Sequence, residues 1–467
     1  MSERPAAAIP GLQVVAIDTP SLGDRSYLVA DGGVAVVVDP QRDLDRVLAL
    51  ADELGVRITH VAETHLHNDY VTGGFALARA TGAGYLVPAR AEVAFERLAV
   101  GDGDVVEVGH RLAVQVVATP GHTFHHVAYL LVVDGRRVGA LTGGSLLYGS
   151  VGRTDLVAAD RTRELTHAQY ASVRKLAEML PAEASVYPTH GFGSFCSATR
   201  AQVGGSTTIG GEARANPALT WDEERFVTEL LAGLDDYPAY YAHMGELNAS
   251  GPSAPDLTPP RPVDPSELRR RIDAGEWVVD LRARRAFAAG HLPGAVNFGM
   301  DGNLATYLGW LMPWGSPLIL LGDSPEQVHD AQVELTRIGV DRPTGAATGS
   351  PAQWSGGGGL STFATASFAE LAVARREPDV VVLDVRRDRE WEESHIKGAV
   401  HIPLHQLRGR IGEIPDGELW VHCAGGYRAS IAASILDAAG RRVVAVDDEY
   451  QSSAVLVGPA TTRGEDR

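Results

Sequence analysis

The sequence is poor in cysteine, in long apolar runs and in positive charge. Only two cysteines, Cys196 and Cys423, occur among the 467 residues, which is too few for a disulfide framework and is consistent with a reducing compartment. No apolar run approaches the roughly 18 residues of a membrane span, and residues 1–10 lack the apolar segment of a secretion signal. We therefore expect a cytoplasmic protein with no membrane partner.

Acidic residues outnumber basic ones, with 59 Asp and Glu against 41 Lys and Arg and a formal net charge of -18. Because this charge repels phosphate backbones, it argues against nucleic acid as a partner and favours small molecules or proteins. Hydrophobic residues make up 45% of the chain, so folded cores are expected. At roughly 150 residues per domain, the length predicts about three domains.

Up to residue 250 the hydrophobic pattern switches between strand and helix periods, which predicts a β-rich layered domain with helices outside. Asp134 and Gly135 lie between two apolar runs and predict a tight hairpin. Residues 248–262 are rich in Ser, Pro and Gly, a linker composition. We place the first domain at residues 1–250.

One pattern then occurs twice. Val-Val-Asp-Leu-Arg at 278–282 matches Val-Leu-Asp-Val-Arg at 382–386, and each copy continues to an apolar strand, a short loop and a helix. We expect two α/β domains with parallel sheets, at residues 262–348 and 363–458, on either side of a connector that contains the glycines at 356–359.

Four histidines directly follow predicted strands. His65 and His67 alternate in Thr-His-Leu-His-Asn-Asp, which ends at Asp69; His122 closes Thr-Pro-Gly-His, and His190 closes Tyr-Pro-Thr-His. A single histidine is more often a packing or surface residue, but imidazole is the commonest metal ligand, and strand-exit loops carry site residues. We predict a site for one metal ion among these five residues.

These motifs resemble the metallo-β-lactamase fold over about residues 10–200, and Thr142 to Leu147 together with Gly-Arg-Thr-Asp at 152–155 is similar to its persulfide dioxygenase branch. The resemblance implies an αββα sandwich and one iron, held by two His and an Asp, that oxidises a thiol persulfide with oxygen. It places His65 and His122 at the two His positions. Arg153 is a candidate for binding a substrate carboxylate, or else braces the turn through Asp155.

Two positions depart from the family pattern. Gly144 stands where the carboxylate ligand is expected, and Tyr70 replaces a histidine of the fold's second metal site. These losses disfavour a binuclear thioesterase. His65, His67 and His122 remain as a three-histidine site, which suits zinc as well as iron, although we favour iron.

Cys423 opens Cys-Ala-Gly-Gly-Tyr-Arg between a predicted strand and a helix. Backbone N–H groups, the positive end of the helix and Arg428 would stabilise a thiolate or persulfide there, whereas an inert buried cysteine needs no such cradle. Residues 363 to about 458 resemble a rhodanese domain, which implies that Cys423 carries sulfane sulfur. In the first repeat Gly322 and Gln327 take the places of Cys and Arg, so we interpret residues 262–348 as a pseudo-rhodanese with a structural or docking role.

Cys196 lies six residues after His190 on a glycine-containing loop. There it either binds or relays a sulfur substrate at the metal cleft or packs beside Phe195.

The domain order resembles fused persulfide dioxygenase and rhodanese proteins, and predicts an enzyme of sulfide and persulfide metabolism that acts on a small-molecule persulfide, thiosulfate or sulfite. Two alternatives stay open: a sulfurtransferase whose first domain does not oxidise, and a zinc thioester hydrolase. The oligomeric state, a homo-oligomer included, is also open.

Overall fold

The structure, a computed structural model, describes residues 9–198 and 206–455. They form two compact units: the first reaches to Asp256 and includes the short segment Thr336–Gly339, and the second contains the rest of the chain from Leu257 on. Residues 1–8 and 456–458, which the expected domain limits include, lie outside the described residues. Within the part described, no helix is both long and apolar enough to cross a bilayer.

Two six-stranded sheets make up the centre of the first unit. One has the order β1-β2-β3-β4-β5-β6 and is antiparallel up to β3 and parallel beyond it. The other has the order β14-β13-β10-β9-β8-β7, with a parallel β10–β13 pair. The strands are β1 (Gln13–Thr19), β2 (Asp24–Asp31), β3 (Val34–Val38), β4 (Arg57–Ala62), β5 (Gly84–Pro88), β6 (Leu98–Val100), β7 (Val105–Glu107), β8 (Leu112–Ala118), β9 (Val127–Val133), β10 (Arg136–Gly143), β13 (Ser185–Pro188) and β14 (Thr207–Thr208), with the small pair β11 (Leu146–Leu147) and β12 (Ser150–Val151).

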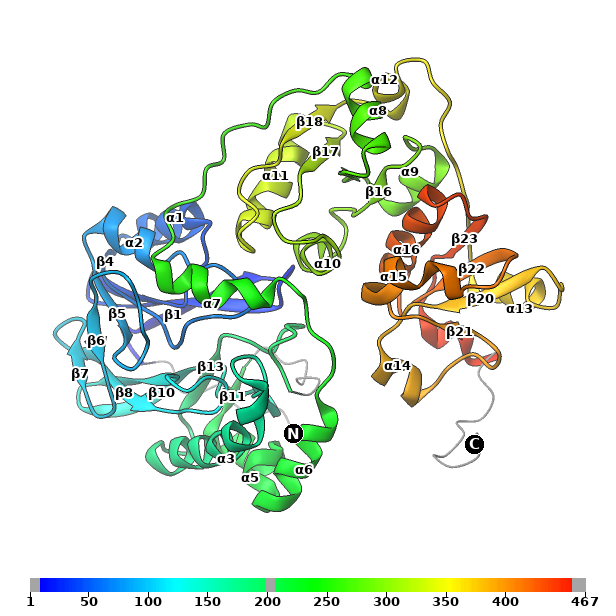
Figure 1. Cartoon of the computed structure of the whole chain (residues 1–467). Helices are drawn as coiled ribbons and strands as arrows, with labels where there is room; N and C mark the ends of the chain where they lie inside the picture. Colours follow the sequence, from blue (N-terminus) through cyan, green and yellow to red (C-terminus); the bar gives the residue numbers. More distant parts are fainter. Residues whose placement is uncertain (1–8, 199–205, 456–467) are drawn as a thin grey trace. The chain divides into compact units, whose positions relative to one another are not determined.

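Helices cover the outer face of each sheet, as Figure 1 shows. Helices α1 (Leu44–Leu54) and α2 (Gly74–Thr81) pack on the first sheet, while α3 (Thr162–Met179) and α6 (Glu223–Gly233) pack on the second. Apolar side chains such as Tyr27 and Tyr129 fill the space between the sheets. The predicted αββα sandwich is therefore confirmed. The remaining helices of the unit are η1 (Ala159–Arg161), α4 (Ile209–Ala215), α5 (Pro217–Thr220) and α7 (Tyr241–Ser250).

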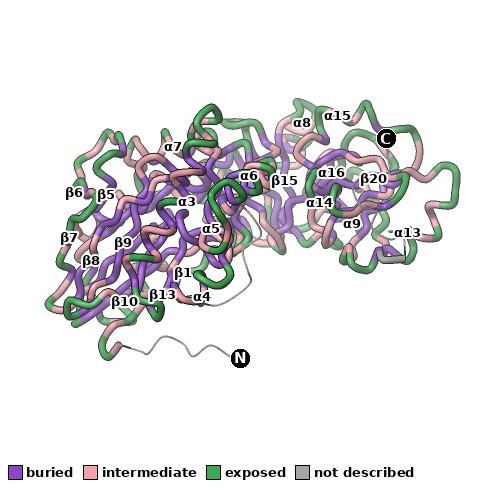
Figure 2. Tube along the Cα trace, turned by 90° about the horizontal axis from the view of Figure 1, so that it is seen from below, coloured by how far each residue is buried: buried purple, intermediate pink, exposed green. Residues whose placement is uncertain are grey.

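The predicted hairpin joins β9 to β10. Asp134 and Gly135 adopt φ values of 49° and 75°, the left-handed conformation that a two-residue turn of this kind requires. Val133 and Arg136 are paired across it. In Figure 2 the buried colour follows these strands, and the exposed colour lies mostly on loops and on the outer faces of helices.

The second unit contains two parallel sheets, as expected. The first has the order β16-β15-β17-β18 and the second the order β19-β23-β22-β20-β21. The first is built from α8 (Pro265–Asp273), β15 (Trp277–Asp280), α9 (Arg284–Ala289), β16 (Val296–Asn297), α10 (Leu304–Leu311), β17 (Leu318–Gly322), α11 (Pro325–Thr336), β18 (Gly345–Thr348) and α12 (Pro351–Ser355). The second is built from β19 (Ala364–Ala366), α13 (Phe368–Ala374), β20 (Val380–Asp384), α14 (Asp388–Glu393), β21 (Val400–His401), η2 (Leu404–Gln406), α15 (Leu407–Arg410), η3 (Ile411–Glu413), β22 (Glu418–His422), α16 (Tyr427–Ala438), β23 (Val443–Val446) and η4 (Tyr450–Val455).

The repeated Asp-x-Arg motif forms the same buried ion pair in both repeats. Arg282 donates to Asp280 and Arg386 donates to Asp384, each with an Nη2–Oδ2 distance of 2.6 Å. Each guanidinium also donates to a backbone carbonyl eight residues further along the chain. The same Asp-x-Arg spacing thus produces the same strand-to-helix turn in both repeats, and the hydrogen bonds of the arginine offset the cost of burying the ion pair.

Candidate metal centre and cysteine site

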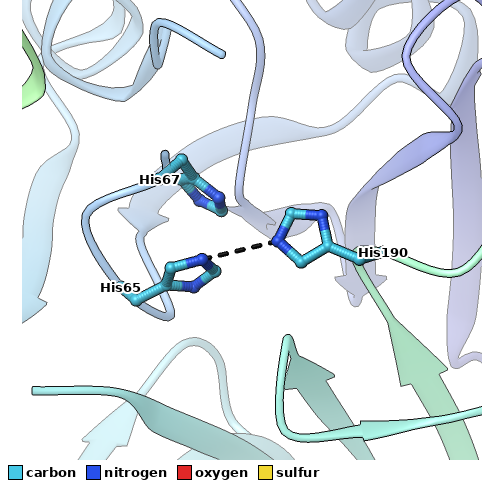
Figure 3. Close-up of side chains that lie close together, drawn as sticks. All are labelled: His65, His67 and His190. Carbon is cyan, nitrogen blue, oxygen red and sulfur yellow. Dashed lines mark hydrogen bonds between the residues drawn. The ribbon is translucent and has the colours of Figure 1, made fainter. Parts of the chain in front are cut away.

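The histidines of the first unit converge at the ends of strands from both sheets. His65 and His67 follow β4, His122 follows β8 and His190 follows β13. All four side chains are fully buried. Figure 3 shows the rings of His65 and His67, which come from one loop, facing that of His190; the dashed line joins the Nε2 atoms of His65 and His190, which are 3.4 Å apart.

Hydrogen bonds fix the tautomer of His65. The Thr64 hydroxyl donates to Asp39 Oδ2 at 2.8 Å, so its oxygen accepts the proton of His65 Nδ1, also at 2.8 Å. Burial and the neighbouring histidines hold the pKa of His65 well below its usual range. His65 is thus neutral, with the lone pair on Nε2, which is the state of a metal ligand.

The same arrangement holds for His122. Its Nδ1 lies 2.7 Å from the carbonyl oxygen of Arg153 and donates to it, so Nε2 carries the lone pair. Nε2 is buried and has no hydrogen-bond partner among the described residues. Burial lowers the pKa of His122 to about 3. An orphaned acceptor inside a protein is costly unless something binds it.

In His67 and His190 the ring nitrogen that points away from the cluster lies beside carboxylates. His67 Nε2 lies 3.2 Å from Asp39 Oδ1 and 3.3 Å from Glu63 Oε2, while its Nδ1 has no partner in the part of the chain that the structure describes. Burial disfavours charge on His67, yet Asp39 and Glu63 together outweigh burial and raise the pKa of His67 to about 9.

His190 Nδ1 lies 2.8 Å from Asp24 Oδ1 and 3.1 Å from Asp69 Oδ2. Desolvation opposes charge on this imidazole too, but the two carboxylates raise its pKa well above the usual range. A carboxylate behind a ligand histidine is the usual means of orienting it.

These residues fit a metal ion. One ring nitrogen from each of His65, His67 and His190 lies within 4.8 Å of the others, and His122, His190 and Cys196 form a second such set. In the structure it is thus His190 that joins His65 and His67, while His122 lies on the side of Cys196. In each histidine one ring nitrogen forms a hydrogen bond or ion pair with a residue outside the cluster, and the other ring nitrogen is directed toward the interior of the cluster.

Gly144, the position expected to hold a carboxylate, has no room for one. A Cβ there would lie 2.3 Å from His122 Cδ2 and 2.7 Å from its Cγ, because the His122 ring occupies the space. The His122 ring therefore takes the space that a side chain at position 144 would need.

We expect Gly144→Ala to destabilise the metal-free first unit by about 1–3 kcal/mol, the usual cost of overpacking. Gly245→Ala is the matched control, since a Cβ at Gly245 meets nothing within 4 Å. Hydrogen exchange in increasing urea, followed by mass spectrometry of peptides from the first unit, measures both variants. Equal stability of Gly144→Ala and the parent would show that His122 moves aside freely.

Other residues of the motifs hold the loops. Tyr70, in place of the expected histidine, directs its hydroxyl to His67 Nε2 at 3.0 Å. His126 Nε2 accepts from the N–H of Gly144, and His125 Nε2 accepts from that of Leu66. The last two histidines are therefore positioning residues of the loops.

Arg153 is buried and its guanidinium binds Asp155 through two hydrogen bonds of 2.7 Å. It also donates to the carbonyl of Asp235 at 2.7 Å. This geometry favours the bracing role over the binding of a substrate carboxylate. Cys196 is fully buried, and burial with Asp69 and Asp24 nearby raises the pKa of its thiol well above the usual range.

The supporting carboxylates were not found from the sequence. Asp24, Asp39 and Glu63 are buried and reach His190 or His67. For Asp39 and Glu63 a signal exists, since each directly follows an apolar strand. Asp24 begins β2, and nothing in its local sequence marks it.

In the last domain Cys423 lies between β22 and α16 and is 2% exposed. Gly426, with φ of 86°, turns the chain into the helix. Arg428 binds Glu390 with distances of 2.6 and 2.8 Å, and despite burial this pairing lowers the pKa of Glu390 to about 2. The cation beside Cys423 is thus held in place by a carboxylate.

A helix of the first repeat contributes to this site. Tyr307 and Trp310 of α10 line a small pocket together with Arg428, Arg387 and His405 of the second repeat. The indole stacks on the His405 ring with centroids 4.8 Å apart. The sequence repeats predict the two domains but not that a helix of one lines the pocket beside Arg428 of the other.

In the first repeat, the side chain of Gln327 fills the loop that corresponds to the Cys423 loop. Gln327, at the position of the arginine, accepts from the N–H of Asp323 at 2.7 Å, and a Cβ on Gly322 would lie 3.1 Å from its Oε1. This geometry agrees with the interpretation of that repeat as one without a nucleophile.

Comparisons with known proteins agree with this architecture. Residues 24–190 match the metallo-beta-lactamase superfamily, and residues 264–354 and 367–452 match the rhodanese-like domain. The chain is 30% identical over 240 residues to persulfide dioxygenase ETHE1, mitochondrial, of Homo sapiens, an alignment that covers 51% of this chain and 80% of that protein. It is 34% identical over 166 residues to hydroxyacylglutathione hydrolase of Methylobacillus flagellatus, covering 35% and 60% of the two chains.

Among solved structures, the crystal structure of a metallo-beta-lactamase from Staphylococcus aureus aligns with a TM-score of 0.65 and 25% identity. It covers 73% of this chain and 100% of its own. The matched families are enzyme families. The chain therefore belongs to the persulfide dioxygenase family of the metallo-β-lactamase superfamily and carries two rhodanese-like domains after its metallo-β-lactamase domain.

Proposed function

We propose that this enzyme oxidises a small-molecule thiol persulfide at an iron centre in its first domain and transfers sulfane sulfur through Cys423 in its last. The observation that carries the proposal is the orientation of four buried histidines, each tied outward by one ring nitrogen. The domain limits that go with it are residues 1–250, 262–348 and 363–458.

His65, His67, His122 and His190, with Asp69 beside them, are the proposed metal residues. Imidazoles with a carboxylate are typical ligands of non-haem iron, and three imidazoles also suit zinc. When bound, iron would supply the redox chemistry with oxygen that no side chain of the protein provides. One thiol persulfide, one dioxygen and one water would then give a thiol, sulfite and two protons.

The chain's own residues hold the ligands and exclude water. Thr64, the Arg153 carbonyl and the pair Asp24 and Asp69 each orient one imidazole. Because the ligand side chains are fully buried, a reactive sulfur species there is shielded from bulk solvent.

Sulfur transfer needs only the last two domains in this proposal. The Cys423 thiolate attacks the outer sulfur of a persulfide, the S–S bond breaks and a thiolate leaves. Sulfite then takes the outer sulfur from the Cys423 persulfide, which forms thiosulfate and restores the thiolate. Arg428, fixed by Glu390, stabilises the anions.

The test is metal content and oxygen uptake of the full chain, purified under low oxygen, on addition of a thiol persulfide. Iron near one per chain with rapid uptake supports the proposal. Absence of metal and uptake, with sulfur transfer intact, would favour a first domain that does not oxidise. Zinc with turnover of a thioester would favour a hydrolase.

Tyr307→Ala is expected to lower the efficiency of sulfur transfer roughly tenfold, about 1.4 kcal/mol of transition-state stabilisation. The reason is that Tyr307 lines the pocket beside Arg428 from the neighbouring repeat. Thiosulfate formation at varied persulfide concentration measures it. Exposed Val373, 67% accessible, offers the control Val373→Ala; an unchanged rate in Tyr307→Ala would limit α10 to a structural role.

A further inference from the structure

We infer that Cys196 is itself a metal ligand, whose thiolate completes a site with His122 and His190 and supplies the negative charge that Gly144 cannot. This inference rests on the proposed metal-dependent function and adds a ligand to it. The sulfur of Cys196 and one nitrogen from each of the two imidazoles lie within 4.8 Å of one another. All three side chains are fully buried.

The first proposed ligand of this site is His122. Its Nδ1 proton is used on the carbonyl of Arg153, so the nitrogen that remains for an ion is Nε2. Within the described ranges this Nε2 has no hydrogen-bond partner and no exposure. A buried lone pair left without a donor indicates a ligand at this place.

The second proposed ligand is His190. Both carboxylates behind it, Asp24 and Asp69, bind the same ring nitrogen, Nδ1, and thereby direct Nε2 into the interior. Asp69 Oδ1 and Asp24 Oδ2 are buried without hydrogen-bond partners among the residues described. The pair thus brings negative charge close to where a cation would bind, as carboxylates behind ligand histidines do.

The third proposed ligand, Cys196, is fixed by the same residue that orients His122. The N–H of Arg153 donates to the carbonyl of Cys196 at 2.8 Å, while the carbonyl of Arg153 accepts from His122. The N–H of Cys196 in turn donates to Ser194 Oγ at 3.2 Å. One peptide segment therefore sets the positions of two of the three proposed ligands, a preorganised arrangement.

The charge and the softness of the Cys196 thiolate favour a role as metal ligand over a role as sulfur relay. A thiolate carries the same single negative charge as the missing carboxylate, and a metal ion deprotonates the thiol that it binds. Two imidazoles and a thiolate select zinc, cobalt or iron over hard cations such as magnesium. The sulfur of Cys196 is fully buried beside two imidazoles, which is the environment of a metal ligand.

The test uses Co²⁺ and the Cys423→Ser variant of the full chain, in which Cys196 is the single remaining thiol. We expect the cobalt-loaded protein to show thiolate-to-cobalt charge-transfer absorption in the near ultraviolet, which only Cys196 can then produce. Adding Cys196→Ser should remove this band and weaken cobalt binding by more than about tenfold.

A Cys423→Ser protein that binds cobalt without showing the charge-transfer band overturns the inference. Failure of the Cys423→Ser protein to bind cobalt at all overturns it too. The first measurement needs no Cys196 variant, so misfolding of Cys196→Ser leaves the inference testable. His167→Ala, a half-exposed histidine paired with Glu223, is the control that should keep the band. Oxygen uptake by the iron-loaded parent is measured separately, so a failed dioxygenase proposal is distinguished from a failed ligand assignment.

Discussion

Replacing Cys423 by serine should lower sulfur transfer by at least about 1000-fold, because covalent catalysis of this kind depends on a single nucleophile. The hydroxyl is nearly the size of the thiol, so the buried turn into α16 is kept. Thiosulfate formation from persulfide and sulfite measures the loss. Oxygen uptake with a thiol persulfide should remain at the level of the parent protein.

The matched control for this variant is Ser452→Ala, at an exposed serine of the same domain. It should transfer sulfur normally. A transfer rate retained by Cys423→Ser would refute the assignment of this cysteine as the sulfur carrier. A simultaneous loss of oxygen uptake would instead show that the two activities depend on each other.

His122→Ala should have the opposite effect. It removes one proposed ligand and leaves the Arg153 carbonyl without its donor, so metal affinity should fall by more than the roughly 10- to 100-fold that the loss of an outer partner costs. Oxygen uptake should disappear while thiosulfate formation through Cys423 continues. Metal content after dialysis and oxygen consumption measure the two parts.

His167→Ala, which removes a half-exposed imidazole, is the control and should retain metal and oxygen uptake. Retention of a full metal complement by His122→Ala would place the ion on His65, His67 and His190 alone, the other set of imidazoles that the fold brings together. Oxygen uptake that survives with that complement would contradict a catalytic role for His122.

Much of the architecture follows from local patterns. The Asp134-Gly135 turn, the Asp-x-Arg repeats at 280–282 and 384–386, and the glycine loop after Cys423 each depend on a few neighbouring residues. Turn conformation and hydrophobic periodicity are local properties, so short motifs predict them. The order of the three domains can also be predicted from the sequence, because each motif indicates the fold of the domain in which it occurs.

The site depends on contacts that are distant in sequence. Asp24 reaches His190 across 166 positions, and Thr189 and Thr64 both bind Asp39, which lies 150 and 25 positions away from them. Whether a histidine is a ligand is decided by which of its nitrogens is already engaged, and that is a property of packing.

A histidine-rich layered domain, two related parallel domains and a cysteine in a glycine-rich loop can all be predicted from the amino-acid sequence, because these are periodic or local features. Three features depend on the folded chain: the His122 ring fills the place beside Gly144, Cys196 lies near His122 and His190, and α10 lines the pocket of Arg428. The physical reason is that distances of a few ångströms between remote side chains arise from the packing of sheets and loops, which no single segment encodes.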